Sequence, residues 1–377
     1  MAVTQMAAEL KAAGHDVIGL GAGEPDFDTP AHICDAAIEA IRAGDTRYTA
    51  VDGTVALKDA IIAKFKRDNA LEYARDQILV SSGAKQTCFN LAAAVLNPGD
   101  EALIPAPYWV SYPDMVLLAD GEPVIVPTGP ETGYKLTPEQ LEAGLTERTR
   151  LMFLNSPSNP TGAAYTRAEL EALGEVLARY PNVVIGTDDM YEHIYWADAP
   201  FCSLVTACPH LYDRTVTING VSKAYAMTGW RIGYCGGPKP IIAAMRKIQS
   251  QSTSNPTSIS QAAAVAALQG DQGCVAEMVT AFKTRHDHIV AALNRIPGIR
   301  CLEGAGTFYA FPDCRELIAR RGFADDSALS EFLLKEAGVA VVPGSAFGAP
   351  GHIRLSFACA LETLEDAAGR MQRALGQ

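Results

Sequence analysis

The chain has 377 residues, of which 48% are hydrophobic and 20% charged, an ordinary composition for a globular protein. This length indicates about two domains, each large enough to bury a sizeable core. The formal net charge of −12 argues against nucleic acid or an anionic membrane surface as the main partner.

Strand-like and helix-like segments alternate along most of the chain, judged from the spacing of their apolar residues. Strands are expected at residues 16–20, 77–80, 101–104, 123–127, 151–154, 183–187, 215–218 and 232–235. Helices are expected at residues 31–43, 54–69, from about 84 to 96, 111–119 and 167–179. Such alternation predicts an α/β fold with a mostly parallel sheet between two layers of helices. In sheets of this kind, ligands bind beyond the carboxyl ends of the strands.

The pattern changes after a long predicted helix at residues 275–295, which could link two lobes. Short strands are expected at 299–302, 307–311, 340–342 and 353–357, with helices at 327–337 and 361–374. This mixture predicts a second, smaller α+β domain. The predicted boundaries are 26–285 for the large domain, and 1–25 together with 286–377 for the small one.

Nine cysteines are scattered through the chain, and no two of them form a Cys-x-x-Cys pair. A disulfide framework is therefore not expected, and the predicted location is a reducing cytoplasm. No apolar run reaches the roughly 18 residues of a membrane-spanning helix, and the first residues do not read as a signal peptide. His286 and His288 stand two apart on a predicted helix and face different ways, so no metal site is predicted.

The most informative stretch follows the strand expected at 215–218. Residues 220–233 read Gly-Val-Ser-Lys-Ala-Tyr-Ala-Met-Thr-Gly-Trp-Arg-Ile-Gly. The amine of Lys223 could form a Schiff base with a carbonyl, and the guanidinium of Arg231 could hold an anion such as phosphate. Pyridoxal phosphate carries both an aldehyde and a phosphate. The alternative, a surface lysine on a glycine-rich turn, is disfavoured because other parts of a site follow neighbouring strands.

The stretch around Lys223 resembles the lysine-attachment signature of class I pyridoxal-phosphate-dependent aminotransferases, which have fold type I. Further resemblances lie in the loop Asn-Ser-Pro-Ser-Asn-Pro-Thr-Gly at 155–162, in Asp188 at the end of a strand, and in Arg354. The motifs run from residue 21 to residue 354, nearly the whole chain. Those at 23–30 and 107–113 resemble bacterial aspartate aminotransferases of the prokaryotic subgroup. The resemblance implies a seven-stranded sheet in the large domain and pyridoxal 5'-phosphate as cofactor.

The resemblance also implies a role for each residue that matches a family motif. The cofactor would bind to Lys223. Its ring would have Asp188 at the ring nitrogen, Tyr191 and Asn159 at the phenolic oxygen, and Trp109 stacked on one face. Its phosphate would be surrounded by Gly83, Ala84, Lys85, Ser222 and Arg231. Tyr48 would reach the phosphate of a partner subunit, which makes the expected assembly a homodimer. Taken alone, Asp188 would be a helix N-cap and Trp109 a core residue. Asp189, beside Asp188, is given no role.

For the substrate, the family pattern implies a bidentate contact of its α-carboxylate with Arg354. Gly23, Trp109 and Asn159 would border the same site, and Lys85 would meet a distal carboxylate. The implied reaction is transfer of an amino group between L-aspartate and 2-oxoglutarate, with ping-pong kinetics and Lys223 as the catalytic base.

Several alternatives stay open. Relatives of this family also use aromatic amino acids or prephenate, or carry out β-elimination on the same scaffold. A dinucleotide-binding enzyme is disfavoured because the glycines at 19, 21 and 23 do not have the Gly-x-Gly-x-x-Gly spacing. A DNA-binding regulator with an aminotransferase-like domain is disfavoured because no basic patch is visible. The resemblance implies a further N-terminal segment that closes over the site, and this chain is expected to begin near the end of that segment.

Overall fold

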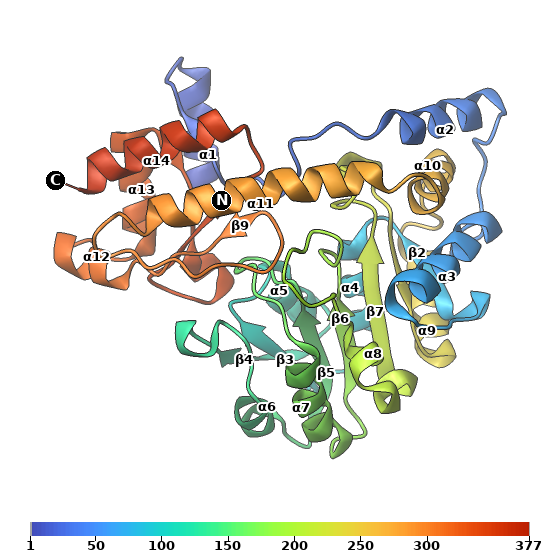
Figure 1. Ribbon diagram of the computed structural model, residues 1–377. Helices are drawn as coiled ribbons and strands as arrows, with labels where there is room; N and C mark the ends of the chain where they lie inside the picture. The colour runs from blue at the N-terminus through green and yellow to red at the C-terminus, as the bar shows by residue number, and fades with distance from the viewer. Residues whose placement is uncertain (1, 377) are drawn as a thin grey trace.

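The computed structural model describes residues 2–376, and its main feature is a seven-stranded sheet between two layers of helices (Figure 1). The strands lie side by side in the order β2 (Ile78–Ser81), β8 (Gly233–Gly236), β7 (Thr215–Gly220), β6 (Val184–Asp188), β5 (Thr149–Asn155), β3 (Glu101–Ala106) and β4 (Glu122–Pro127). Strand β8 is antiparallel to both neighbours, and the other strands all run in one direction. The predicted mostly parallel α/β sheet is confirmed.

Alternate side chains of each strand pack against different helix layers, since successive residues of a strand point to opposite faces. In β5, Leu151 and Phe153 belong to one buried cluster, while Met152 and Leu154 belong to another. The first layer consists of α4 (Ala84–Val95), α5 (Ser111–Leu118) and α9 (Lys239–Ser252). The second consists of α6 (Pro138–Gly144), α7 (Arg167–Ala178) and α8 (Leu204–Ala207). A third group covers the β2–β8 end of the sheet: α2 (Ala31–Arg42), α3 (Val55–Asn69) and α10 (Ser258–Gln269).

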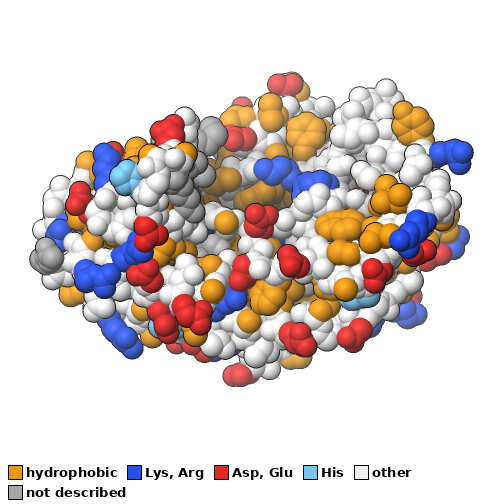
Figure 2. All heavy atoms as spheres, turned by 90° about the horizontal axis from the view of Figure 1, so that it is seen from above, with side chains coloured by type: hydrophobic (Ala, Val, Ile, Leu, Met, Phe, Trp, Pro, Cys, Tyr) orange, Lys and Arg blue, Asp and Glu red, His pale blue; other side chains and the backbone are white. Residues whose placement is uncertain are grey.

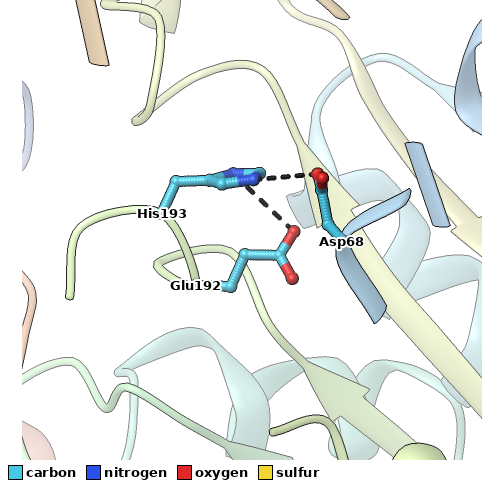
Figure 3. Close-up of side chains that lie close together, drawn as sticks. All are labelled: Asp68, Glu192 and His193. Atoms are coloured by element: carbon cyan, nitrogen blue, oxygen red, sulfur yellow. Dashed lines mark hydrogen bonds and ion pairs between the residues drawn. The ribbon is translucent and has the colours of Figure 1, made fainter. Parts of the chain in front are cut away.

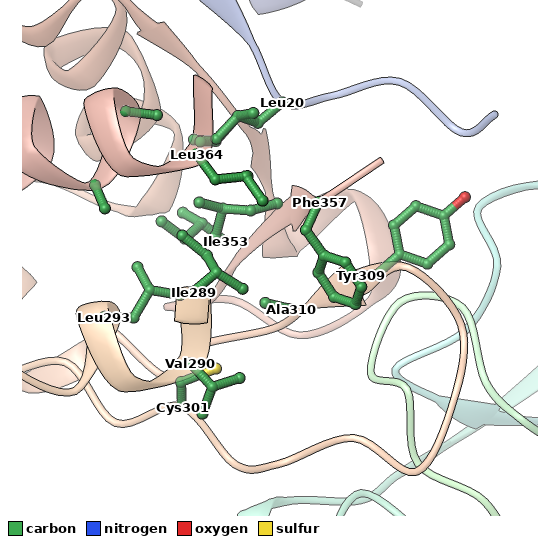
Figure 4. Packing of buried hydrophobic residues seen from close by; sticks show 14 of the residues in the cluster. Leu20, Ile289, Val290, Leu293, Cys301, Tyr309, Ala310, Ile353, Phe357 and Leu364 are labelled. Carbon is green, nitrogen blue, oxygen red and sulfur yellow. The ribbon is translucent and has the colours of Figure 1, made fainter. Parts of the chain in front are cut away.

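Helix α11 (Gly273–Leu293) leads from α10 to the C-terminal elements, as its orange ribbon shows in Figure 1. Its apolar side chains Ile289, Val290 and Leu293 pack into one cluster with Ile353 and Phe357 (Figure 4). The other helices of this part are α12 (Arg315–Arg321), α13 (Asp326–Ala337) and α14 (Leu361–Leu375). Its antiparallel three-stranded sheet has the order β11 (Val342–Pro343), β12 (Ile353–Ser356) and β9 (Tyr309–Ala310). This mixture agrees with the expected α+β character.

Two expectations for short strands are wrong. Residues 299–302 form no strand beyond an isolated antiparallel bridge between Arg300 and Asp313. Both backbone groups of Cys301 bond to the side chain of Asn294, at 2.8 and 2.9 Å, instead of to a neighbouring strand. The single strand expected at 340–342 is divided between two sheets. Val339–Ala340 (β10) pairs with Ile18–Gly19 (β1), and β11 pairs with β12.

Helix α1 (Ala2–Ala12) was not predicted, and it packs against the C-terminal part of the chain. Its residue Ala7 lies in a small cluster with Val17, Leu334 and Ala340. This cluster places α1 beside α13 and β10. The exact domain boundaries, 26–285 and the remainder, stay a prediction.

Acidic and basic side chains are intermixed on the face shown in Figure 2. Within residues 2–376, every helix is too short or too polar to cross a bilayer.

Candidate active site

A cavity of about 720 Å³ lies at the carboxyl ends of the central parallel strands. Asn155 and Asp188 are the last residues of β5 and β6, and Ser222 and Lys223 follow the end of β7. Of the predicted site residues, the lining includes Gly23, Ala84, Lys85, Trp109, Asn159, Asp188, Tyr191, Ser222, Lys223, Arg231 and Arg354. Residues that are more than 300 positions apart in the sequence therefore share one site, at the edge of the sheet where ligands of α/β proteins bind.

The amine of Lys223 points into this cavity and donates a hydrogen bond of 2.5 Å to the carbonyl of Gly23. Burial lowers the pKa of Lys223 to about 8; the positive charges of Arg231 and Arg354 act in the same direction, and Glu24 acts against them. At neutral pH, on the order of a tenth of the amine is then uncharged, compared with less than a thousandth for an exposed lysine. The uncharged form is the nucleophile and the proton acceptor.

Asp188 brings a buried carboxylate to the same cavity. Its Oδ2 accepts a 2.6 Å hydrogen bond from the hydroxyl of Tyr112, and its Oδ1 accepts one of 3.2 Å from the N–H of Met190. The Tyr112 ring is itself fixed by stacking on Phe153, with ring centroids 4.7 Å apart. Burial raises the pKa of Asp188 above its usual range, although these hydrogen bonds oppose the shift. A carboxylate in such surroundings gains most from a cationic partner inside the cavity.

The first turn of α4 and the side chain of Arg231 meet at the cavity and have the chemistry that an anion site needs. The guanidinium of Arg231 donates 2.8 Å to the carbonyl of Thr228 and lies directly over Gly83. The φ of Gly83 is +86°, which favours glycine, and a Cβ there would be 2.3 Å from Nη2 of Arg231 and would displace the guanidinium. The first N–H groups of a helix have no acceptor within it, which favours a phosphate at Ala84 and Lys85.

Arg354 forms the opposite end of the site and is buried. Its Nη1 donates 3.0 Å to Oδ1 of Asn159, and its Nη2 donates 2.9 Å to the carbonyl of Gly21. The guanidinium carbon lies 4.4 Å from the ring centroid of Tyr309 and 4.8 Å from that of Phe347. Among the described residues, Nε of Arg354 has no hydrogen-bond acceptor. A guanidinium fixed in this way, with a donor to spare, is suited to a carboxylate ligand.

Two predicted residues do not line the cavity. Gly83 lies behind the guanidinium of Arg231, as described above. Tyr48 lies outside the cavity, and 92% of its surface is exposed. Lys85 does reach the cavity, and its Nζ lies 5.1 Å from the ring centroid of Trp109.

Sequence reasoning missed several lining or supporting side chains. Tyr112 stands three residues after Trp109 at the start of a helix, a spacing that could have revealed it. Asn155 opens the Asn-Ser-Pro loop, and its side chain donates 2.8 Å to the carbonyl of Asp188. Tyr309 gave no signal, because only the tertiary structure brings its hydroxyl to 3.1 Å from that of Tyr191.

Comparisons with known proteins agree with this geometry. The family model "Aminotransferase class I and II" matches residues 15–371. The chain therefore belongs to the class I and II aminotransferase family.

Individual relatives cover almost the whole chain. An aspartate/prephenate aminotransferase of Nitrosomonas europaea is 58% identical over 377 residues, which is 98% of this chain and 95% of that protein. The solved aspartate aminotransferase of Rhizobium meliloti has a TM-score of 0.95 and 48% identity, covering 99% of this chain and 95% of that one. An aspartate aminotransferase of Thermus thermophilus solved with maleate has a TM-score of 0.92 and 41% identity, with coverage of 99% and 95%.

Proposed function

We propose that this chain transfers an amino group between L-aspartate and 2-oxoglutarate, giving oxaloacetate and L-glutamate, with pyridoxal 5'-phosphate bound at Lys223. One observation carries the proposal: the Lys223 amine, the buried Asp188 carboxylate and two guanidiniums, Arg231 and Arg354, border the same cavity. An amine, an acid and two anion-binding groups are the set that a phosphorylated aldehyde cofactor and an amino acid need together.

The residues present fit that cofactor. Its phosphate would be held by the first turn of α4, Ser222 and Arg231, where positive charge and free N–H groups coincide. Its ring nitrogen, when protonated, would meet Asp188, whose buried carboxylate favours a cation. Trp109 would stack on the ring, and Asn159 and Tyr191 would lie at its phenolic oxygen. When bound, pyridoxal phosphate supplies the aldehyde and the electron-withdrawing ring for reactions at the substrate Cα.

Side chains of the protein would orient the substrate and accept its Cα proton. Arg354 would hold the substrate α-carboxylate and so orient the Cα–H bond, and Asn159, which accepts from Nη1 of Arg354, keeps the guanidinium in place. The neutral Nζ of Lys223 would accept the Cα proton. Its lowered pKa, about 8, makes it a competent base near neutral pH.

Relatives support aspartate as the substrate, since the proteins of Nitrosomonas europaea and Rhizobium meliloti are both aspartate aminotransferases by name. The former is also named for prephenate, so prephenate is the second candidate. Transfer to aromatic amino acids and β-elimination on the same scaffold complete the alternatives.

A half-reaction separates these candidates. Purified protein loaded with pyridoxal phosphate is mixed with one amino acid at a time, and both the cofactor absorbance and the released products are measured. Aspartate and glutamate are expected to convert the cofactor to its amine form with one 2-oxo acid released per site. Release of pyruvate and ammonia would identify a lyase instead. Faster conversion by phenylalanine or by the amino acid formed from prephenate would reject aspartate as the preferred donor.

The substitution Lys85→Ala tests whether Lys85 binds the distal carboxylate of the substrate. A charge-assisted hydrogen bond is worth about 1.5–3 kcal/mol, so kcat/KM for aspartate and glutamate is expected to fall by roughly 10- to 150-fold. The value for alanine should change by less than about threefold, because alanine has no second carboxylate. Equal losses for aspartate and alanine would reject this role for Lys85.

A homodimer with shared sites is also part of the proposal. A second hollow of about 450 Å³ adjoins the cavity, and it is lined by Lys85 and Arg231 together with the apolar side chains Phe89, Met115 and Leu118. Leu118 is 72% exposed and Tyr48 92% exposed, as expected for side chains that a second copy covers. The Tyr48 hydroxyl of one subunit would then reach the phosphate in the other. Free thiols at all nine cysteines favour a cytoplasmic location.

A further inference from the structure

A second group of charged side chains does not line the cavity, and the proposed mechanism does not use it. Its centre is Glu192, which is only 6% exposed and follows Tyr191 directly in the chain. The fully buried ammonium of Lys64, from α3, contacts Oε1 of Glu192. Buried charges of this kind are costly unless every donor and acceptor is satisfied, so their surroundings are informative.

The carboxylate of Glu192 is satisfied by donors from two other segments of the chain. Besides Lys64, it accepts a 2.6 Å hydrogen bond from Nδ2 of Asn69 and one of 2.7 Å from Nδ2 of Asn219. Lys64 and Asn69 both belong to α3, and Asn69 also accepts 2.8 Å from the Lys64 ammonium. Asn219 belongs to β7. Glu192 therefore joins α3, the turn after β6 and the end of β7.

Figure 3 shows the outer part of this group, where the imidazole of His193 lies between Glu192 and Asp68. Its Nε2 is 3.0 Å from Oδ2 of Asp68, and its Nδ1 is 3.7 Å from Oε1 of Glu192. The three side chains have the spacing of metal ligands. However, the ammonium of Lys64 already contacts Glu192 and lies 4.0 Å from Asp68, so a cation is built into the group.

Two of the three segments joined at Glu192 carry proposed cofactor contacts. Glu192 lies four residues after Asp188 and one after Tyr191. Asn219 lies four residues before Lys223, and its Oδ1 accepts 2.7 Å from the N–H of Gly220 at the end of β7. The hydrogen bond between Glu192 and Asn219 is thus a side-chain connection between the segment of Asp188 and Tyr191 and the segment of Lys223.

We propose that Glu192 and Asn219 are positioning residues, which fix the Lys223 segment relative to the Asp188–Tyr191 segment, with the Lys64 ammonium holding the Glu192 carboxylate in place. The inference rests on the proposed function of Lys223 and Asp188. It predicts that losing the Asn219 contact changes the electronic surroundings of the bound cofactor more than it changes the fold.

Asn219 and Asn69 offer a matched pair for the test. Each is buried, at 1% and 4% exposure, and each gives one amide donor to Glu192. Only Asn219 belongs to the segment that carries Lys223. Asn219→Ala and Asn69→Ala should therefore lower the melting temperature of the cofactor-free protein by similar amounts. If Asn219→Ala does not accumulate as folded protein, Asn219→Ser replaces it.

The deciding readouts are the pH midpoint of the absorbance change of the bound cofactor, and kcat and KM for aspartate. Asn219→Ala is expected to move the midpoint by about half a pH unit or more. It should also lower kcat by roughly 10- to 100-fold at nearly constant KM, the scale of a misplacement of about 1 Å. Asn69→Ala should leave the midpoint within about 0.2 units and kcat within about threefold.

Equal changes in both variants, or no change in either, would overturn the positioning role, because the effects would then follow stability alone. Failure of the proposed function looks different: the unsubstituted protein would itself show no cofactor absorbance that titrates. The two ideas are therefore tested separately by one set of spectra.

Discussion

Replacing Lys223 with alanine is expected to lower turnover of aspartate by roughly four orders of magnitude or more. The variant loses the amine that would hold the cofactor and the base that would accept the Cα proton, and a positioned base alone contributes about 10²- to 10⁴-fold. The amine lines the cavity, donates a hydrogen bond to the carbonyl of Gly23, and has a pKa lowered to about 8. No other described lysine except Lys85 lines that cavity.

Lys85→Ala is the matched control for this variant. It removes the other lysine of the cavity, yet it should keep the absorbance of attached cofactor and turn over alanine normally. Steady-state rates and absorbance spectra of both variants, at equal cofactor saturation, make the comparison. A Lys223→Ala protein with a kcat within tenfold of the unsubstituted protein would exclude Lys223 as the catalytic residue.

Asp188→Asn and Asp189→Asn should differ sharply although the two residues are adjacent and both are buried. Asp188→Asn keeps the shape and an oxygen that can accept from Tyr112, but it removes the negative charge that would face the ring nitrogen. Loss of one electrostatic contact of this kind costs about 10²- to 10³-fold in kcat. Cofactor affinity should fall as well.

Asp189 provides the internal control. Burial and the nearby charge of Glu192 raise the pKa of Asp189 to about 7, so near neutral pH it is already partly uncharged. Its Oδ1 accepts from the hydroxyl of Thr187 at 2.7 Å, and an amide oxygen can do the same. Asp189→Asn should keep kcat within about threefold. Similar losses in the two variants would mean that Asp188 has no specific part in the chemistry.

The large sheet could be predicted because its strands other than the edge strand β4 are buried on both faces and therefore stand out as short apolar runs between polar turns. Helix ends could be predicted where a local signal marks them. Thr54, the predicted first residue of a helix, accepts a hydrogen bond from the N–H of Leu57. It therefore caps α3, which begins one residue later at Val55. Signals of this kind lie within four or five residues of the element they mark.

The short strands of the C-terminal part could not be placed in this way. Strands β1, β9, β10 and β11 each have two residues, which is too short for a periodic pattern. Their pairing depends on residues that are distant in sequence, such as Ile18 beside Val339. Residues 299–302 look like a strand, but Asn294 takes both backbone hydrogen bonds of Cys301.

In the site, too, residues within local sequence motifs could be predicted, and residues that meet only through tertiary contacts could not. Lys223, Asp188, Asn159 and Arg354 follow or lie on strands within motifs that resemble a family, and the structure brings all four to one cavity. The Glu192 group gave no signal, because it joins α3, the turn after β6 and β7 only through tertiary contacts. Tyr309 was missed for the same reason. Side chains whose partners lie far along the chain cannot be recognised from one sequence.

Reduction with borohydride shows which side chain holds the cofactor. Protein loaded with pyridoxal phosphate is treated with borohydride, digested and analysed by mass spectrometry, with the Lys223→Ala variant in parallel. A phosphopyridoxyl group is expected on the peptide that contains residue 223, and no such peptide is expected from the variant. Label on another lysine in the unsubstituted protein, or no label at all, would contradict attachment of the cofactor to Lys223.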